Sequence, residues 1–260
     1  TLTAPTVGDA DQCEETGGGG HMSLVEHLNE LRGRLIKIVL AVAIGAVIVW
    51  VFYDQVLEFL KAPLDEADPD AVLILTDPLQ GLATRFKVSG YGGVALATPI
   101  ILWQLWRFIT PGLYPKERRY AVPFVASGVA LFVLGASLAY WTLPRALSFL
   151  ISIGGEDIEA FYTPDKYIQL IVYMMLAFGV GFEFPIILVF LQLAGLVSYK
   201  TLASWRRYAL IGIVVLVAVI TPSGDPISLA VLAVPMYLFY ELSILIGRII
   251  TRRRVAAAAP

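Results

Sequence analysis

Two acidic residues interrupt stretches of the chain that are otherwise apolar. Glu183 lies within residues 178–185, and Glu241 lies within residues 227–250. A charged carboxylate near the middle of a bilayer costs roughly 2–3 kcal/mol on insertion scales, so such acids are usually functional or are buried in the neutral form. Glu183 is therefore a candidate functional residue; the alternative is a neutral carboxyl that bonds to a neighbouring helix beside a kink at Pro185. For Glu241 the argument is weaker, because we expect it to lie near water.

A polar stretch at residues 108–119 carries another acid, Glu117, among several basic residues. Pro115 favours the first turn of a helix, and an acid in that turn offsets the helix dipole, which gives Glu117 a structural interpretation. The other interpretation is that Glu117 offers an anion at the membrane surface.

Leucines at positions 24, 28, 31 and 35 follow the three- and four-residue spacing of a helix. This pattern predicts an amphipathic helix that lies at the membrane interface and carries Glu30, Arg32 and Arg34 among its polar residues. Taken alone, the segment is equally compatible with a basic anchor for anionic lipid headgroups.

No recognisable catalytic centre or metal site is present in the sequence. The single cysteine and the two histidines all lie in the first 27 residues, which rules out an intrachain disulfide and most metal sites and catalytic triads. In aspartyl intramembrane proteases, one acid of the catalytic pair lies in a Gly-x-Gly-Asp motif. Asp225 could be compared with that acid and Asp54 with its partner, but Pro222 replaces the first glycine of the motif. Both acids also fall at the outer end of a span, and no Gly-x-Ser-Gly or His-Glu-x-x-His motif is present.

A secondary transporter or proton channel is a second alternative, motivated by Glu183. Such proteins place several acids or broken helices along one path and are often built from inverted repeats. Here only Glu183 and Glu241 are available, and no internal repeat is evident. This class, and a purely structural membrane subunit, are therefore less favoured. We expect no enzyme activity, no cofactor and no nucleic-acid partner.

The composition indicates a membrane protein. Of the 260 residues, 58% are hydrophobic and 15% are charged, and the mean hydropathy is +0.75. A span needs about 20 apolar residues. Six spans are predicted, at residues 35–53, 82–106, 120–143, 167–193, 208–220 and 227–250. The fifth reaches only about 20 Å as a helix, so it must thin the bilayer or stop part-way across.

Basic residues in the loops set the predicted orientation. Fourteen of the 19 lysines and arginines fall on one side of the six-span arrangement, whereas the opposite loops, 54–81 and 144–166, are rich in acids. The positive-inside rule then places both termini in the cytoplasm, which requires an even number of spans. We expect short helices in the two outer loops. We also expect a flexible leader over residues 1–21, one domain over 22–254 and a disordered tail over 255–260.

Five motifs in order along the chain resemble those of the TatC family, the multispanning receptor subunits of the twin-arginine protein translocase. They occupy residues 27–35, 62–64, 106–119, 178–185 and 221–226. The resemblance covers residues 22–254. It implies an all-α fold of six transmembrane helices in a concave, glove-like bundle with short fifth and sixth spans, located in the cytoplasmic (inner) membrane.

The resemblance implies a receptor that binds twin-arginine signal peptides of folded cargo proteins at the cytoplasmic face. Glu30 and Glu117 match acidic positions of the family's recognition site, and Leu31, Arg32 and Phe108 match positions in or beside the same patch. Two carboxylates can bind two guanidinium groups in bidentate pairs, a geometry that a lysine ammonium cannot reproduce. Transport in this family uses the proton motive force.

Other roles follow from the same resemblance. Structural roles are assigned to three residues: Pro63, Tyr140 and Pro185. Glu183 matches an acid in the concave groove, where it would meet a polar group of a single-span partner or draw water in. Thr221 and Asp225 match the outer junction of the last two spans, where TatA/TatB-type subunits are thought to dock, and Glu241 is grouped with these intramembrane polar residues. Leu229 stands where a glutamine is common in the family. The resemblance is also compatible with self-association of the chain.

Overall fold

The computed structural model describes residues 24–109, 121–154, 161–193, 195–221 and 225–257. This part of the chain is all-helical except for one isolated bridge between Leu73 and Tyr162, as the sequence predicts. The helices are α1 (Leu24–Val51), α2 (Tyr53–Ala67), α3 (Gln80–Ile109), α4 (Ala121–Gly154), α5 (Pro164–Gly181), α6 (Phe184–Leu193), α7 (Tyr199–Ser204), α8 (Arg206–Ile220) and α9 (Pro226–Ala257).

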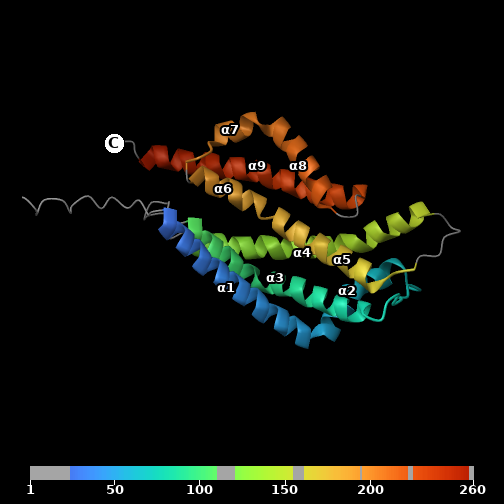
Figure 1. The fold of residues 1–260 in the computed structure, drawn as a ribbon. Helices are drawn as coiled ribbons and strands as arrows, with labels where there is room; N and C mark the ends of the chain where they lie inside the picture. Colours follow the sequence, from blue (N-terminus) through green and yellow to red (C-terminus); the bar gives the residue numbers. More distant parts are fainter. Residues whose placement is uncertain (1–23, 110–120, 155–160, 194, 222–224, 258–260) are drawn as a thin grey trace, which may run out of the picture.

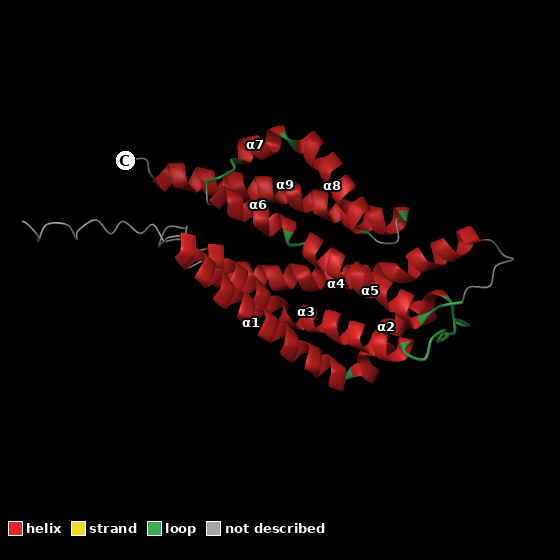
Figure 2. Ribbon diagram, in the orientation of Figure 1, coloured by secondary structure: helices red, strands yellow, loops and turns green. Residues whose placement is uncertain are grey.

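The long helices run back and forth along one direction (Figure 1). α4 and α5 lie in the middle, α1 and α3 pack on one side, and α7, α8 and α9 lie on the other. The beginning of α1, the end of α3 and the end of α9 share one end of the bundle, here called the N-terminal end. Figure 2 shows that the described loops lie mainly between the ends of these helices.

Five described segments are long and apolar enough to cross a membrane: Leu28–Val51, Gln80–Phe108, Val122–Ile153, Pro164–Leu193 and Pro226–Thr251. α8 matches the predicted short fifth span: its 15 residues reach about 22 Å, less than the ~30 Å of a hydrocarbon core. α8 lies beside α9 and runs in the opposite direction (Figure 1). The arrangement is consistent with six crossings and with both chain ends on one side.

The structure differs from the sequence predictions at both ends of the chain. The amphipathic segment at 24–35 is continuous with the first span in α1, because Gly33 alone does not stop a helix. Leu28, Leu31 and Leu35 are exposed on it. The sixth span predicted at residues 227–250 is confirmed as Pro226–Thr251, but it is not the short span that the resemblance implies. The helix α9 has 32 residues, tolerates Pro235 and continues through arginines that favour helix.

The fourth span is confirmed as Pro164–Leu193, and it is kinked near Pro185. Its helix is divided into α5 and α6 at Phe182 and Glu183, where the Glu183 amide donates to the Val180 carbonyl at 3.1 Å, three residues back. Pro185 has no N–H to continue the ladder, so the chain turns here. In the outer loops, α2 is a short helix as expected, but residues 144–154 extend α4 instead of forming a separate helix.

Glycines allow two pairs of helices to pack with their backbones in contact. A Cβ on Gly93 of α3 would lie 2.6 Å from the Ala46 amide nitrogen and 2.7 Å from the Val42 carbonyl oxygen of α1. A Cβ on Gly135 of α4 would lie 2.5 Å from the Phe178 carbonyl oxygen of α5. Small residues at such crossings let membrane helices approach closely, where dispersion forces are strongest.

Two tyrosines fasten α2 across the end of the bundle opposite to the N-terminal end. Pro63 lies inside α2 and has no N–H, so the carbonyl of Phe59, four residues earlier, lacks its helical donor. The hydroxyl of Tyr140, from α4, donates to this carbonyl at 2.9 Å, and its ring stacks on Phe59. The hydroxyl of Tyr167, from α5, donates to the Leu60 carbonyl at 2.6 Å. Pro63 and Tyr140 therefore form one structural unit.

The Tyr140→Phe substitution should lower the free energy of unfolding by about 1 kcal/mol, because the Phe59 carbonyl loses its donor. In a Pro63→Ala background the new amide of residue 63 can supply that donor. There the loss caused by Tyr140→Phe should shrink toward zero. Denaturant unfolding in detergent of the two single variants and the double variant measures this coupling. Equal losses in both backgrounds would contradict it.

Candidate functional site

The N-terminal end of the bundle brings together several of the predicted binding residues. Glu30 lies on α1 one turn before Arg34, and Arg34 Nη2 donates to Glu30 Oε1. Helix periodicity places residues four apart on one face, which explains the pair. The Glu30 side chain keeps 25% of its surface exposed, and that of Arg34 keeps 13%.

Arg34 also connects α1 to α3, because its Nη1 lies 3.5 Å from the carbonyl oxygen of Gln104. The two helices are antiparallel (Figure 1). One turn back along α1 from Arg34 is Glu30, and one turn forward along α3 from Gln104 is Phe108. Glu30 and the half-buried Phe108 therefore lie at the same level of the bundle, as neighbours in one patch.

The other predicted binding residues lie around this patch or outside the described part of the chain. On α1, Leu31 is 42% exposed and Arg32 is exposed. Glu117 lies outside the described residues, nine positions after Phe108 in the sequence. The site as described thus holds one carboxylate, one resident guanidinium and an aromatic side chain.

Glu183 points into the bundle from the turn between α5 and α6. A Cβ on Gly128 of α4 would lie 3.0 Å from Glu183 Oε2 and 3.0 Å from Leu102 Cδ1 of α3. The Oε1 atom is buried and has no hydrogen-bond partner among the described residues. Because Gly128 has no side chain, it leaves room for the carboxyl group of Glu183. The neighbouring Pro185 is buried at the start of α6.

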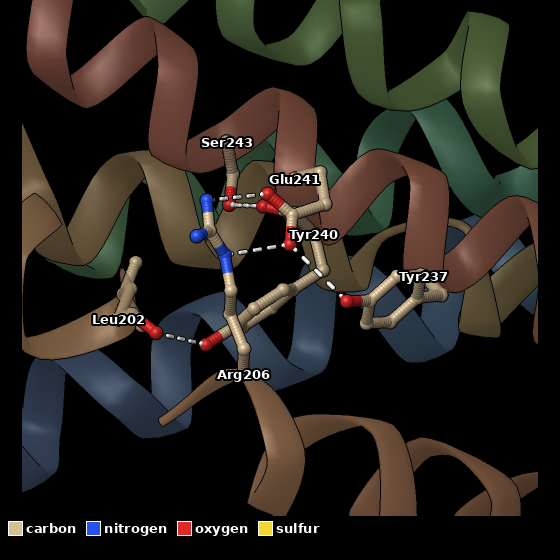
Figure 3. A network of polar contacts seen from close by, with 6 residues as sticks. All are labelled: Leu202, Arg206, Tyr237, Tyr240, Glu241 and Ser243. Carbon is tan, nitrogen blue, oxygen red and sulfur yellow. Dashed lines mark hydrogen bonds and ion pairs between the residues drawn. The ribbon is translucent and has the colours of Figure 1, made fainter. Parts of the chain in front are cut away.

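Glu241 is part of a polar network that joins α9 to α7 and α8 (Figure 3). Arg206, the first residue of α8, makes a two-pronged pair with Glu241, with Nε to Oε1 at 2.8 Å and Nη2 to Oε2 at 2.9 Å. Tyr237 donates to the same carboxylate at 3.2 Å, and Tyr240 donates to the Leu202 carbonyl at 2.6 Å. Glu241 therefore holds this hairpin of helices together within the chain.

Thr221 and Asp225 lie at the opposite end of the bundle, at the junction of α8 and α9. Thr221 ends α8 and is buried, and its Oγ1 has no partner among the described residues. Asp225 precedes α9, and its Oδ1 accepts from the Ser228 amide at 2.7 Å, which is the geometry of a helix N-cap. Leu229 is half-buried on the next turn. The junction of α8 and α9 lies at the end of the bundle opposite to the beginning of α1 (Figure 1).

Some polar residues with clear contacts were not singled out as site residues from the sequence, among them Arg34, Arg206 and Gln192. The pair of Arg34 with Glu30 could have been found from its four-residue spacing. Arg206 lies 35 positions from Glu241, and Gln192 donates from Nε2 to the Ser243 carbonyl, 51 positions away, at 2.9 Å. No local pattern predicts such pairs. Within the described residues, no group of three or more His, Cys, Asp or Glu side chains could hold a metal ion.

Comparison with known proteins gives consistent matches. The family model described as Sec-independent protein translocase protein (TatC) matches residues 26–235. The chain is 40% identical to the protein of that name from Aquifex aeolicus (strain VF5), over 90% of this chain and 98% of the relative. The Deinococcus radiodurans protein of the same name is 39% identical, over 87% and 86%.

Solved structures agree with these sequence matches. A crystal structure of the twin arginine translocase receptor TatC is 39% identical, with a TM-score of 0.74, and the match covers 87% of this chain and all of that chain. A second crystal structure of this receptor, in DDM, is 40% identical with the same TM-score, over 85% of this chain and 99% of the other. The likeness therefore extends to the arrangement of helices over most of the chain.

Proposed function

Because the chain belongs to the TatC family and is a receptor component of the twin-arginine, Sec-independent protein translocase, we propose that it binds the paired arginines of signal peptides at the N-terminal end of its bundle. The chain is a multi-span membrane protein with a transport function and is not an enzyme. Glu30 and Glu117 are the proposed ligands of the two guanidinium groups, with Leu31, Arg32 and Phe108 around them.

The observation that carries this proposal is the pairing of Glu30 with a guanidinium inside the chain itself. The Glu30 carboxylate already accepts from Arg34 at a partly exposed position, level with Phe108. Glu117 follows Phe108 closely enough in the sequence to add a second carboxylate. Two acids near the headgroup region suit two guanidinium groups, because each pair can be bidentate and is weakly screened there.

The proposed orientation places this end of the bundle in the cytoplasm and the junction at Thr221 on the opposite side of the inner membrane. It is supported by Arg32, Arg107 and Arg248, which are exposed at the N-terminal end, and by the acid-rich α2 region at the other. Basic residues accumulate on the cytoplasmic side of membrane proteins. Cargo signal peptides would then reach Glu30 directly from the compartment in which cargo folds.

The experiment that tests the binding proposal compares two peptides. The purified chain in detergent should bind a signal peptide with an Arg-Arg pair at least about tenfold more tightly than its Lys-Lys counterpart, because ammonium groups cannot form the bidentate pairs. Fluorescence anisotropy with a labelled peptide measures both affinities. Equal affinities for the two peptides would contradict the proposed binding site for paired arginines.

We further propose that Glu183, with Thr221 and Asp225, serves assembly with TatA/TatB-type single-span subunits. The supporting feature is a carboxyl oxygen of Glu183 that is buried inside the bundle with no described partner. The Glu183→Ala variant should keep its affinity for the Arg-Arg peptide within about twofold, because Glu183 lies at the turn between α5 and α6 and shares no described contact with Glu30. It should reduce co-purification of the single-span subunits and export of a reporter cargo. Loss of peptide binding would contradict this assignment.

A further inference from the structure

We propose that Arg34 is a resident competitor for the carboxylate of Glu30, and that this competition sets the preference of the receptor for arginine over lysine. The inference rests on the proposed function of Glu30 in binding signal peptides. It assigns Arg34 a role in specificity, separate from the residues proposed to bind the peptide.

The contacts of Glu30 leave an incoming cation little room beside Arg34. Glu30 Oε1 accepts from Arg34 Nη2, and Oε2 is enclosed by the protein. With Oε2 buried and Oε1 bonded to Arg34, the carboxylate does not offer both of its oxygens to the fork of a second guanidinium while Arg34 stays in place. A peptide guanidinium that binds Glu30 in a bidentate manner must therefore displace Arg34 from it.

Arg34 is held in a way that permits displacement. Besides Glu30, Arg34 contacts the Gln104 carbonyl at 3.5 Å, which is the outer limit for a hydrogen bond. Its Nε atom is buried without a hydrogen-bond partner among the described residues. The pair with Glu30 is therefore its main polar attachment, and a ligand that replaces Arg34 at Glu30 disrupts little else.

Displacement favours a ligand that carries guanidinium groups. Such a ligand restores the hydrogen bonds that Arg34 gives up, because its planar fork of donors matches the carboxylate. An ammonium is a compact, strongly hydrated point charge with no fork, so it recovers less at Glu30 and meets a stronger repulsion from the displaced Arg34 charge than a delocalised guanidinium does. A repulsive element of this kind separates two ligands that would otherwise both be attracted to the acid.

The test measures the affinities of Arg-Arg and Lys-Lys signal peptides for the full chain in detergent. Arg34→Gln removes the competing charge, and Arg34→Lys keeps the charge without the fork. Lys37→Gln is the matched control, because Lys37 is an exposed cation on the same helix. Thermal unfolding of each variant verifies folding, and Arg34→Lys carries the test if Arg34→Gln does not fold.

The proposal predicts that Arg34→Gln binds the Arg-Arg peptide roughly threefold to tenfold more tightly and the Lys-Lys peptide by a larger factor, so that the ratio of affinities falls about threefold or more. Arg34→Lys should change the ratio in the same direction, and Lys37→Gln should leave it unchanged. Weaker binding of the Arg-Arg peptide, or an unchanged ratio in folded Arg34 variants, would overturn the competitor role alone. An unvaried chain that shows no preference would overturn the proposed function and this inference together.

Discussion

The double variant Glu30→Ala/Glu117→Ala is expected to bind a twin-arginine signal peptide about a hundredfold or more weakly than the unvaried chain, and each single variant about tenfold more weakly. A hydrogen bond to a charged group contributes roughly 1.5–3 kcal/mol, and tenfold in affinity corresponds to about 1.4 kcal/mol. The loss should therefore be close to additive if each carboxylate binds its own guanidinium. Anisotropy titration of the labelled peptide measures all three affinities.

A matched control is available at the opposite end of the bundle. Glu58 is an exposed acid on α2, and Glu58→Ala removes the same charge without touching the proposed site. The affinity of the Glu58→Ala variant for the peptide should stay within about twofold of the affinity of the unvaried chain. Because Glu30→Ala also leaves the partly buried Arg34 without its described partner, the unfolding temperature of each variant must be compared. Normal affinity in folded Glu30 and Glu117 variants would place the arginine site elsewhere.

The Gly93→Ala variant is expected to lose about 2 kcal/mol or more of the free energy of unfolding, as overpacked cores do. The added methyl group would meet backbone atoms of Val42 and Ala46, which cannot rotate away as a side chain can. α1 would have to move off α3, which carries nearly all of its packing. Denaturant unfolding in detergent, followed by circular dichroism, measures the loss.

Gly90→Ala is the control for Gly93, because both glycines lie within α3. A Cβ on Gly90 would meet no atom within 4 Å. Alanine has the higher helix propensity, so Gly90→Ala should be neutral or should stabilise the chain by up to about 1 kcal/mol. Gly93→Ala should thus lower the free energy of unfolding, whereas Gly90→Ala should leave it unchanged or raise it. Similar stabilities of the two variants would show that the α1–α3 crossing tolerates a wider separation.

The crossings of the chain could be predicted from sequence because the bilayer imposes them. Lipid requires long apolar segments, and α1, α3, α4 and α9 each contain one. The positions at which the helices begin and end depend on local features that hydropathy does not capture. The break at Glu183 follows from a single missing amide at Pro185, and the length of α9 follows from arginines that are polar yet favour helix.

The candidate site was predictable only in part. The acids stood out as charges in unusual places, and the TatC resemblance gave Glu30 a role. The pair with Arg34 was visible in its spacing, since residues four apart share a helix face. By contrast, the pair of Arg206 with Glu241 and the bond from Tyr140 to Phe59 join distant positions, and only the packing of whole helices brings these residues together.

The fastening of α2 by Tyr140 and Tyr167 has a consequence for the order in which the protein is made. The ribosome synthesises α2 well before the two tyrosines that bond to it, because Tyr140 follows Phe59 by 81 positions and Tyr167 follows Leu60 by 107. Because the chain is made from its N-terminus, contacts between an early helix and a later one form only after the later helix has been made. Until α5 has been inserted, the buried leucines Leu60 and Leu64 have no core to cover them. We expect an amphipathic helix in that state to rest on the lipid surface, so that insertion of α5 completes this end of the bundle.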